Sequence, residues 1–376
     1  MTSARTYLDH NATAPLRREA RAAMLSALDV VGNPSSPHGE GRRARALVED
    51  AREAVAALVG ARPAEVVFTS GGTEANNTVL AGGWQAILVA EVEHDSVLAP
   101  ARNSGARIVE LAVGSDGVIA ADGLAGALRQ TSAGRRLLSL QMANNETGVL
   151  QSVGSAARQA REAGFAVHTD AVQAAGRMPI DFAGVGVDYL TLSAHKLGGP
   201  KGVGALVMRD GAALPSLIAG GGQERRRRAG TENVAAIAGF GAAAIAARAE
   251  LHGMQRVGAL RDGLEREVRA VTPEAIIVGA AADRLANTTS LALPGASAET
   301  LVIALDLRGI AVSAGAACSS GKVGVSHVLA AMGLAPEIAR AAIRISLGTQ
   351  STEQDIARFL GAWAHLARGR RERAVA

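Results

Sequence analysis

The stretch "EVVFTSGGTEANN", residues 65–77, joins an apolar segment to a glycine turn and a polar segment. This is the pattern of a buried strand that ends in a tight turn and leads into a helix. Six more short apolar segments follow along the chain, at residues 86–91, 107–113, 136–142, 165–170, 188–193 and 202–208. Helical patterns such as residues 152–164 separate several of them, and amphipathic helical patterns precede them at residues 17–29 and 41–60.

Strands that are apolar almost throughout, and that alternate with helices, are typical of a parallel sheet covered on both faces. We therefore predict an α/β fold with a mostly parallel seven-stranded sheet sandwiched between helices. Ligands of such folds bind beyond the carboxyl ends of the strands. The residues that directly follow each strand are thus the first candidates for function.

The last third of the chain has a different pattern. Two long helical segments run from about residue 231 to 271. Strand patterns then appear at residues 287–295, 309–315 and 342–348, with helical patterns at residues 298–309, 326–333 and 352–367. We predict a large domain at residues 15–254 and a smaller α+β domain formed by residues 1–14 and 255–376.

Composition and charge argue against several classes of protein. The formal net charge is +4, and the run Arg225–Arg228 accounts for it. No basic stretch is interleaved with aromatic residues, so we expect no direct binding of nucleic acid. The longest segment without a charge, residues 75–90, is shorter than the roughly 20 apolar residues that a bilayer span requires.

The N-terminal residues lack the apolar core of a secretory signal, and Cys318 is the single cysteine, so no internal disulfide is possible. We therefore expect a cytoplasmic protein.

Lysine is rare in this chain. Of 39 basic Lys and Arg side chains only three are lysines, namely Lys196, Lys201 and Lys322. Arginine carries positive charge equally well but cannot lose its proton, so a retained lysine indicates chemistry that needs an amine. Lys196 follows the strand pattern that ends at Ser193 and precedes a glycine-rich turn, which favours a functional role. We interpret Lys201 and Lys322 as structural or surface residues.

Three stretches at strand ends together indicate a cofactor. The turn Gly71–Thr73 offers backbone N–H groups and a hydroxyl to an anion. Asp170 ends a strand, although an aspartate there is also a common helix cap. Pyridoxal phosphate needs a lysine for its Schiff base, a carboxylate at its pyridine nitrogen and an anion site for its phosphate. Lys196, Asp170 and the turn supply one of each, so we predict pyridoxal 5′-phosphate as the cofactor and no metal.

At these residues the sequence resembles the cysteine desulfurases (NifS/IscS-like) of the class V pyridoxal-phosphate-dependent aminotransferase superfamily. The matching motifs run from "YLDHNATAP" at residue 7 through "TSGGTEANN", "EHDSVL", "NNETG", "HTDAVQ", "SAHKLGGPKG", "GGGQERRRRAGTEN" and "GAACSSG" to "IRISLG" at residue 348. The resemblance implies fold type I of these enzymes and a homodimer. It also implies a set of cofactor-binding residues: Gly72, Thr73, His94, Asn145, Asp170, Gln173, Ser193, His195, Lys196 and, from the partner subunit, Thr231.

The resemblance further assigns roles to single side chains. Lys196 would hold the cofactor and move protons, His94 would stack on the ring and assist, and Asn145 and Arg344 would bind the substrate carboxylate. Unaided, His94 would be interpreted as a capping or surface residue and Asn145 as a turn residue. Arg344 lies within an apolar strand pattern, where a buried guanidinium needs an anion.

Cys318 lies in "SAGAACSSGK", residues 313–322, among small residues that offer no packing anchors. The resemblance implies that Cys318 is the nucleophile that takes sulfur from L-cysteine as a persulfide, leaves L-alanine and passes the sulfur to an acceptor or scaffold protein. Iron–sulfur cluster assembly is one expected destination of the sulfur. The residues after Cys318, "SSGKVGVSHV", lack the acidic residue and proline usual in family members with a long loop.

Alternative functions are a selenocysteine lyase or another class V aminotransferase, neither of which needs the thiol, and a basic nucleic-acid binder. The resemblance places the run Arg225–Arg228 on a loop beside the active site and the dimer interface, whereas its surplus arginines could equally be solvated, so the sequence leaves its role open.

Overall fold

The computed structural model describes residues 5–131, 134–315 and 325–375, and the side chains up to residue 368. Its main sheet contains the seven strands predicted from the sequence: β2 (Val66–Thr69), β3 (Ala86–Ala90), β4 (Arg107–Leu111), β5 (Arg136–Ser139), β6 (Ala166–Asp170), β7 (Tyr189–Ser193) and β8 (Gly204–Met208). Their order is β2-β8-β7-β6-β5-β3-β4, and β8 alone runs antiparallel to its neighbours. The prediction of a mostly parallel seven-stranded sheet is confirmed.

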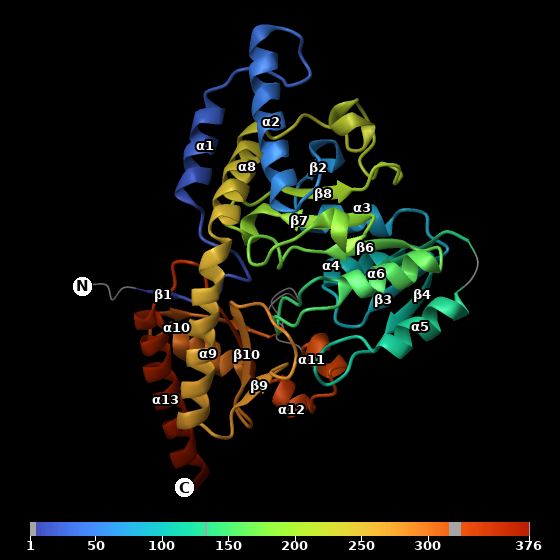
Figure 1. Ribbon diagram of the computed structural model, residues 1–376. Coiled ribbons are helices and arrows are strands. Elements are labelled where there is room, and N and C mark those ends of the chain that lie inside the picture. Colours follow the sequence, from blue (N-terminus) through green and yellow to red (C-terminus); the bar gives the residue numbers. More distant parts are fainter. Residues whose placement is uncertain (1–4, 132–133, 316–324, 376) are drawn as a thin grey trace.

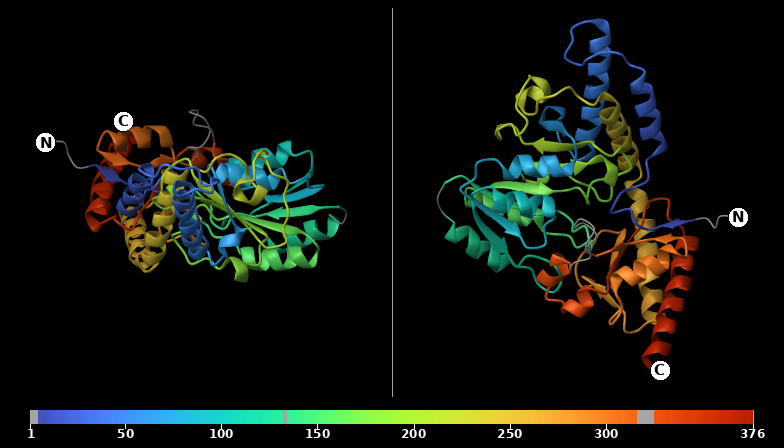
Figure 2. Two further views of the ribbon diagram at one scale, coloured as in Figure 1. Left: turned by 90° about the horizontal axis from the view of Figure 1, so that it is seen from above. Right: turned by 180° about the vertical axis from the view of Figure 1, so that it is seen from behind.

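Helices cover both faces of this sheet (Figures 1 and 2). Strand residues alternate between two apolar clusters, as for Val66 and Val67, because successive side chains of a strand point to opposite faces. The first face packs against α2 (Gly39–Leu58), α5 (Ala121–Gln130), α6 (Val153–Glu162) and α8 (Val234–Ala249). The second face packs against α3 (Gly72–Leu80) and α4 (Asp95–Asn103). The short helix α7 (Phe182–Val185) follows β6, and α1 (Arg18–Leu28) packs on α8.

A four-stranded antiparallel sheet forms the second part of the molecule, in the order β12-β13-β10-β9. Its strands are β9 (Ile276–Val278), β10 (Thr288–Ala292), β12 (Ser313–Ala314) and β13 (Ala342–Ser346). Helices α9 (Met254–Val271), α10 (Ala298–Asp306) and α13 (Glu353–Val375) pack on one face, and α11 (His327–Ala331) contributes to the core on the other. Helix α12 (Pro336–Ala339) precedes β13.

The prediction of one continuous strand at residues 309–315 is wrong. This stretch forms two short strands that belong to different sheets. β11 (Ile310–Ala311) pairs with β1 (Thr6–Tyr7), whereas β12 pairs with β13. The N-terminal segment supplies the partner of β11, so the break depends on a neighbour about 300 residues away in the sequence.

The division into residues 15–254 and residues 1–14 with 255–376 stays a prediction. One apolar cluster supports it, because its buried members are Leu8 and residues from Met254 to Trp363, all of which except Met254 fall in the predicted small domain. Both figures show the N-terminal strand beside the C-terminal part of the chain.

Among the described residues no single helix has the length and apolar composition to span a membrane; α8 and the segment Leu251–Val271 reach that threshold only as a pair bent by 53°. In the same residues no three His, Cys, Asp or Glu side chains are grouped so that they could hold a metal ion.

Candidate active site

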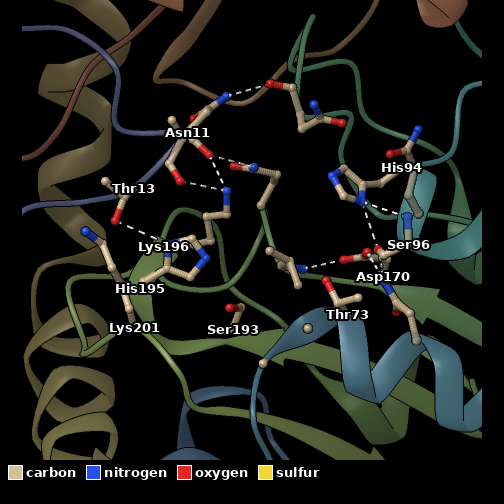
Figure 3. Close-up of a pocket in the computed structure, with 18 of the residues that line it drawn as sticks. Asn11, Thr13, Thr73, His94, Ser96, Asp170, Ser193, His195, Lys196 and Lys201 are labelled. Atoms are coloured by element: carbon tan, nitrogen blue, oxygen red, sulfur yellow. Dashed lines mark hydrogen bonds between the residues drawn. The ribbon is translucent and has the colours of Figure 1, made fainter. Parts of the chain in front are cut away.

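A cavity of about 640 Å³ lies at the carboxyl ends of β2, β6 and β7, where the sheet topology predicts a ligand site (Figure 3). It is lined by the side chains that the sequence analysis singled out for cofactor and substrate: Gly72, Thr73, His94, Asn145, Asp170, Gln173, Ser193, His195, Lys196 and Arg344. The N-terminal residues Asn11–Thr13 complete the wall. Segments from the whole length of the chain therefore meet in one place.

Lys196 ends the short 3-10 helix η2 (Ala194–Lys196), which directly follows β7. Its Nζ donates hydrogen bonds to the carbonyl oxygens of Asn11 at 2.7 Å and Ala12 at 2.9 Å. These bonds hold the amine at the cavity wall formed by the N-terminal segment. Figure 3 shows Lys196 and Asp170 entering the cavity from different sides.

Asp170 is the last residue of β6, and its carboxylate is fixed from two directions. Oδ1 accepts a hydrogen bond from the backbone N–H of Val172 at 2.9 Å, and Oδ2 accepts one from Asn76 Nδ2 at 2.8 Å. The same amide group of Asn76 also donates to Ser96 Oγ at 2.8 Å. Asp170 makes no ion pair within the described part of the chain, so its negative charge is available to a cationic group in the cavity.

The start of α3 forms the end of the cavity that suits an anion. Its N-cap residue Gly71 supplies no capping side chain, so the first N–H groups of the helix remain available to a ligand. A Cβ atom at Gly72 would lie 2.9 Å from Val172 Cγ2, so this position requires a residue without a side chain. Thr73, Ser193 and His195 lie around the same turn.

Both histidines of the cavity are kept neutral by their surroundings. Burial lowers the pKa of His94, and the nearby Asp170 charge opposes this only in part. His94 Nδ1 accepts the N–H of Ser96 at 3.0 Å, which leaves Nε2 as the protonated nitrogen. Burial and the Lys196 charge lower the pKa of His195 to about 4, and its Nδ1 lies 3.2 Å from Thr13 Oγ1.

Arg344 lies in the middle of β13 and its side chain is almost fully buried. Its Nη2 donates to Asp9 Oδ1 at 2.9 Å, and its Nη1 donates to the carbonyl oxygen of Asn145 at 3.1 Å. Asp9 Oδ2 in turn accepts a hydrogen bond from Ser313 Oγ at 2.8 Å. A buried guanidinium needs an anion, and Asp9 supplies it for Arg344. Arg344 nevertheless lines the cavity.

Several residues of the site escaped the sequence analysis. The cavity is also lined by Asn11, Thr13, Ser70, Asn76, Ser96, Gln141, Lys201 and Ser313. Lys201, interpreted from sequence as structural or surface, is a cavity residue, and its charge contributes to the lowered pKa of His195. The rarity of lysine was a usable signal for Lys201, and the motif "YLDHNATAP" was one for Asn11 and Thr13. Asn76 had no comparable signal.

Two predicted site residues are not placed in this cavity. Thr231 is exposed and does not line it. Cys318 lies outside the described residues. The run Arg225–Arg228 is partly engaged in the protein: Arg225 Nη1 donates to the Ala64 carbonyl oxygen at 2.6 Å, and Arg228 pairs with Glu74 at 3.0 Å.

Comparisons with known proteins agree with this geometry. The family model described as aminotransferase class V matches residues 6–359. The chain belongs to the class V aminotransferase family, within its cysteine desulfurases. A cysteine desulfurase from Cereibacter sphaeroides is 46% identical over 369 residues, which cover 95% of this chain and 94% of the relative.

Solved structures extend the comparison to the fold. A NifS-like protein from Rickettsia africae is 35% identical with a TM-score of 0.90, covering 96% of this chain and 99% of the other. A structure described as SspA in complex with cysteine is 28% identical with a TM-score of 0.79, covering 92% of this chain and all of that one. The predictions of the family and of the fold class are confirmed.

Proposed function

We propose that this protein is a pyridoxal-phosphate-dependent cysteine desulfurase, which converts L-cysteine to L-alanine and transfers the sulfur to Cys318. The observation that carries the proposal is the convergence of Lys196, Asp170 and Arg344 on a single cavity that also contains an uncapped helix N-terminus. Its cysteine desulfurase relatives, and the cysteine bound in the structure of SspA, support the choice of substrate.

The donor set of the cavity fits pyridoxal phosphate. Lys196 offers an amine for covalent attachment, and Asp170 offers a carboxylate for the ring nitrogen. Gly72, Thr73 and Ser193 offer N–H and hydroxyl donors for a phosphate. Asp170 makes no ion pair with any described residue, and this supports the fit, since a buried carboxylate is stabilised by a cationic partner. When bound, the cofactor withdraws electrons from the substrate, which weakens the bond between the α-carbon and its proton.

The residues of the chain supply binding and proton transfer. Arg344 binds the α-carboxylate of L-cysteine, with the side chain of Asn145 beside it. Lys196 Nζ takes the proton from the α-carbon and returns a proton to the product. Burial lowers the pKa of His94, so its imidazole would lie beside a bound cofactor without placing a second cation there.

The sulfur transfer balances without an external oxidant. The Cys318 thiolate attacks the sulfur atom of the substrate, the bond between that sulfur and the β-carbon breaks, and the electron pair stays with the carbon until a proton is added. L-Cysteine and a thiol thus become L-alanine and a persulfide. An acceptor or scaffold protein then takes the outer sulfur atom, for iron–sulfur cluster assembly or another sulfur-containing product.

We also propose that the enzyme is a homodimer and that Thr231 completes the phosphate site of the partner subunit. The exposure of Thr231 away from its own cavity supports this arrangement. A cytoplasmic location fits the single cysteine, since a reactive thiol needs a reducing compartment.

The variant Cys318→Ser tests the proposed reaction. A serine hydroxyl is a far weaker nucleophile toward sulfur than a thiolate, so we expect the variant to bind the cofactor and L-cysteine but to release no alanine and carry no persulfide. Alanine is measured by chromatography, and the persulfide by alkylation and mass spectrometry. Alanine release at the parent rate would show a lyase, of the kind that acts on selenocysteine, in place of a desulfurase.

A second variant tests the cofactor separately. Lys196→Ala should lose both turnover and the covalent attachment that borohydride reduction reveals, whereas Lys322→Ala should keep the attachment. Covalent attachment in Lys196→Ala would contradict the assignment.

A further inference from the structure

Arg177 is a buried residue that the proposed reaction does not use. It lies seven residues after Asp170, at the end of the turn that follows β6, and is 8% exposed. The preceding Gly176 has φ +74°, and a Cβ atom there would lie 3.1 Å from Ala247 and 3.2 Å from Leu197. This close packing leaves no room for a side chain at Gly176.

The guanidinium of Arg177 connects three segments of the cavity wall. Its Nη1 donates to the backbone oxygen of Gln173 at 3.0 Å and also contacts the side-chain oxygen Oε1 of Gln173. Its Nη2 donates to the carbonyl oxygens of His10 and Lys196, each at 3.2 Å. The segments that carry Lys196, Gln173 and Asn11 are therefore held by one side chain.

These contacts determine the orientation of the Gln173 amide. A guanidinium only donates hydrogen bonds, so the atom of Gln173 that faces Arg177 must be the oxygen. The nitrogen Nε2 then faces the other way, and it donates to the Asn11 carbonyl oxygen at 3.1 Å. Gln173 also lines the cavity, so its second N–H is the group that it can offer to a ligand.

Arg177 also carries a positive charge that no carboxylate of the described residues neutralises. All four of its acceptors are neutral oxygens, and it makes no ion pair within residues 5–131, 134–315 and 325–368. Burial lowers the pKa of Arg177 to about 9, and the Arg344 charge adds to this, so the guanidinium is still protonated at neutral pH. Its charge contributes to the lowered pKa values of His10 and His195.

We propose that Arg177 is a positioning residue that turns the Gln173 amide nitrogen toward the ring hydroxyl oxygen of pyridoxal phosphate and, through its buried charge, keeps that oxygen anionic. The inference rests on the cofactor proposed above. An N–H donor beside a buried cation favours an oxygen anion over a hydroxyl. A lysine at this position would have the same charge, but its ammonium group lacks the planar arrangement of N–H donors with which the guanidinium contacts three segments.

The test compares two cofactors on the full-length protein. Pyridoxal phosphate and its 3-deoxy analogue, which lacks the ring hydroxyl, are titrated into cofactor-free parent and Arg177→Met protein. We expect Arg177→Met to lower the affinity for pyridoxal phosphate by about tenfold and to change the affinity for the analogue far less. The pH midpoint of the visible absorption band of bound pyridoxal phosphate should rise by about one unit, and Arg177→Lys should keep most of the parent midpoint.

Two results would overturn the role of Arg177. One is an Arg177→Met protein with the parent's affinity and midpoint; the other is an equal loss of affinity for both compounds, which indicates a structural role alone. If Arg177→Met does not fold, Gln173→Leu provides the same comparison, and equal effects on the two compounds again contradict the proposal. Failure of the parent itself to bind pyridoxal phosphate would instead contradict the proposed function.

Discussion

At the scale of single residues, the fold raises the pKa of the Glu146 carboxyl group. It is buried in the motif "NNETG", and Ser326 Oγ donates to its Oε2 at 2.6 Å. Burial raises the pKa of Glu146 to about 7, the charge of Arg344 opposes this, and Asp95 adds to it. Ser326 caps α11 by accepting the N–H of Leu329, so Glu146 supports the start of this helix.

The raised pKa predicts a dependence of stability on pH. Between pH 4.5 and about 7 the folded protein holds a proton on Glu146 that the unfolded chain has lost, so the free energy of unfolding falls as pH rises through this window. Glu146→Gln removes this titration. The free energy of unfolding of Glu146→Gln minus that of the parent should therefore grow by up to about 3 kcal/mol as pH rises from 4.5 to 7.

Thermal unfolding from pH 5 to 8 checks this prediction. The control is Glu53→Gln, which changes an exposed glutamate of α2 and should follow the parent at every pH. A constant difference in melting temperature between Glu146→Gln and the parent would contradict the assignment.

At the scale of elements, the 3-10 helix η3 (Gln223–Arg226) contains three consecutive residues with left-handed backbone: Glu224 at φ +45°, Arg225 at +56° and Arg226 at +65°. Glu224 explains how this conformation is held. Its buried carboxylate accepts two hydrogen bonds from Arg52, at 2.7 and 2.8 Å, and one from the N–H of Phe68 at 2.8 Å. The ion pair fixes the loop against α2 and β2.

The left-handed backbone of η3 predicts that Arg226→Gly stabilises the protein. Arg226 is exposed, and a left-handed residue with a side chain costs roughly 1–2 kcal/mol, which exceeds the entropy cost of glycine. We expect the free energy of unfolding to rise by about 1 kcal/mol in a denaturant titration. The matched control Arg45→Gly, at an exposed position inside α2, should lower it by about 1 kcal/mol. A loss of stability in Arg226→Gly would show that this side chain has a stabilising partner.

At the scale of the whole molecule, the proposed dimer explains two features of the surface. Thr231 lies away from its own cavity, and large apolar side chains are exposed on and after α1 (Leu25, Leu28, Val31) and in the loop before η3 (Leu217, Ile218). Figure 1 shows α1 and this loop at the same end of the molecule, away from the four-stranded sheet. A second copy of the chain would cover apolar surface there.

Mixing two inactive variants tests the shared site. Lys196→Ala lacks the amine, and Thr231→Glu places a carboxylate where a phosphate is expected. If Thr231 serves the partner's site, mixed dimers contain one intact site, and exchange of subunits should restore about a quarter of the parent activity. Each variant incubated alone is the control. No recovery in a mixture that sedimentation shows to contain mixed dimers would contradict the sharing of the site.

Much of this protein was predictable from its sequence because the signals are local. An apolar run bounded by turn residues specifies a buried strand, so the seven strands of the main sheet and the α/β class followed from short windows of sequence. Asp170 was identified because it ends a strand, and Lys196 because it closely follows one and is one of only three lysines in the chain. The topology of parallel strands then placed them at one edge.

Tertiary structure alone decided the contacts between distant segments. Three sets of hydrogen bonds in the site join parts of the chain that are 94 to 335 residues apart. Asn76 donates to Asp170, Lys196 donates to the carbonyl oxygens of Asn11 and Ala12, and Arg344 donates to Asp9. The division of residues 309–315 into two strands and the buried charge of Arg177 have the same origin. Such features depend on which groups packing brings within hydrogen-bond distance, because a buried polar group must find its partners wherever the fold places them, and no local pattern of residues encodes that distance.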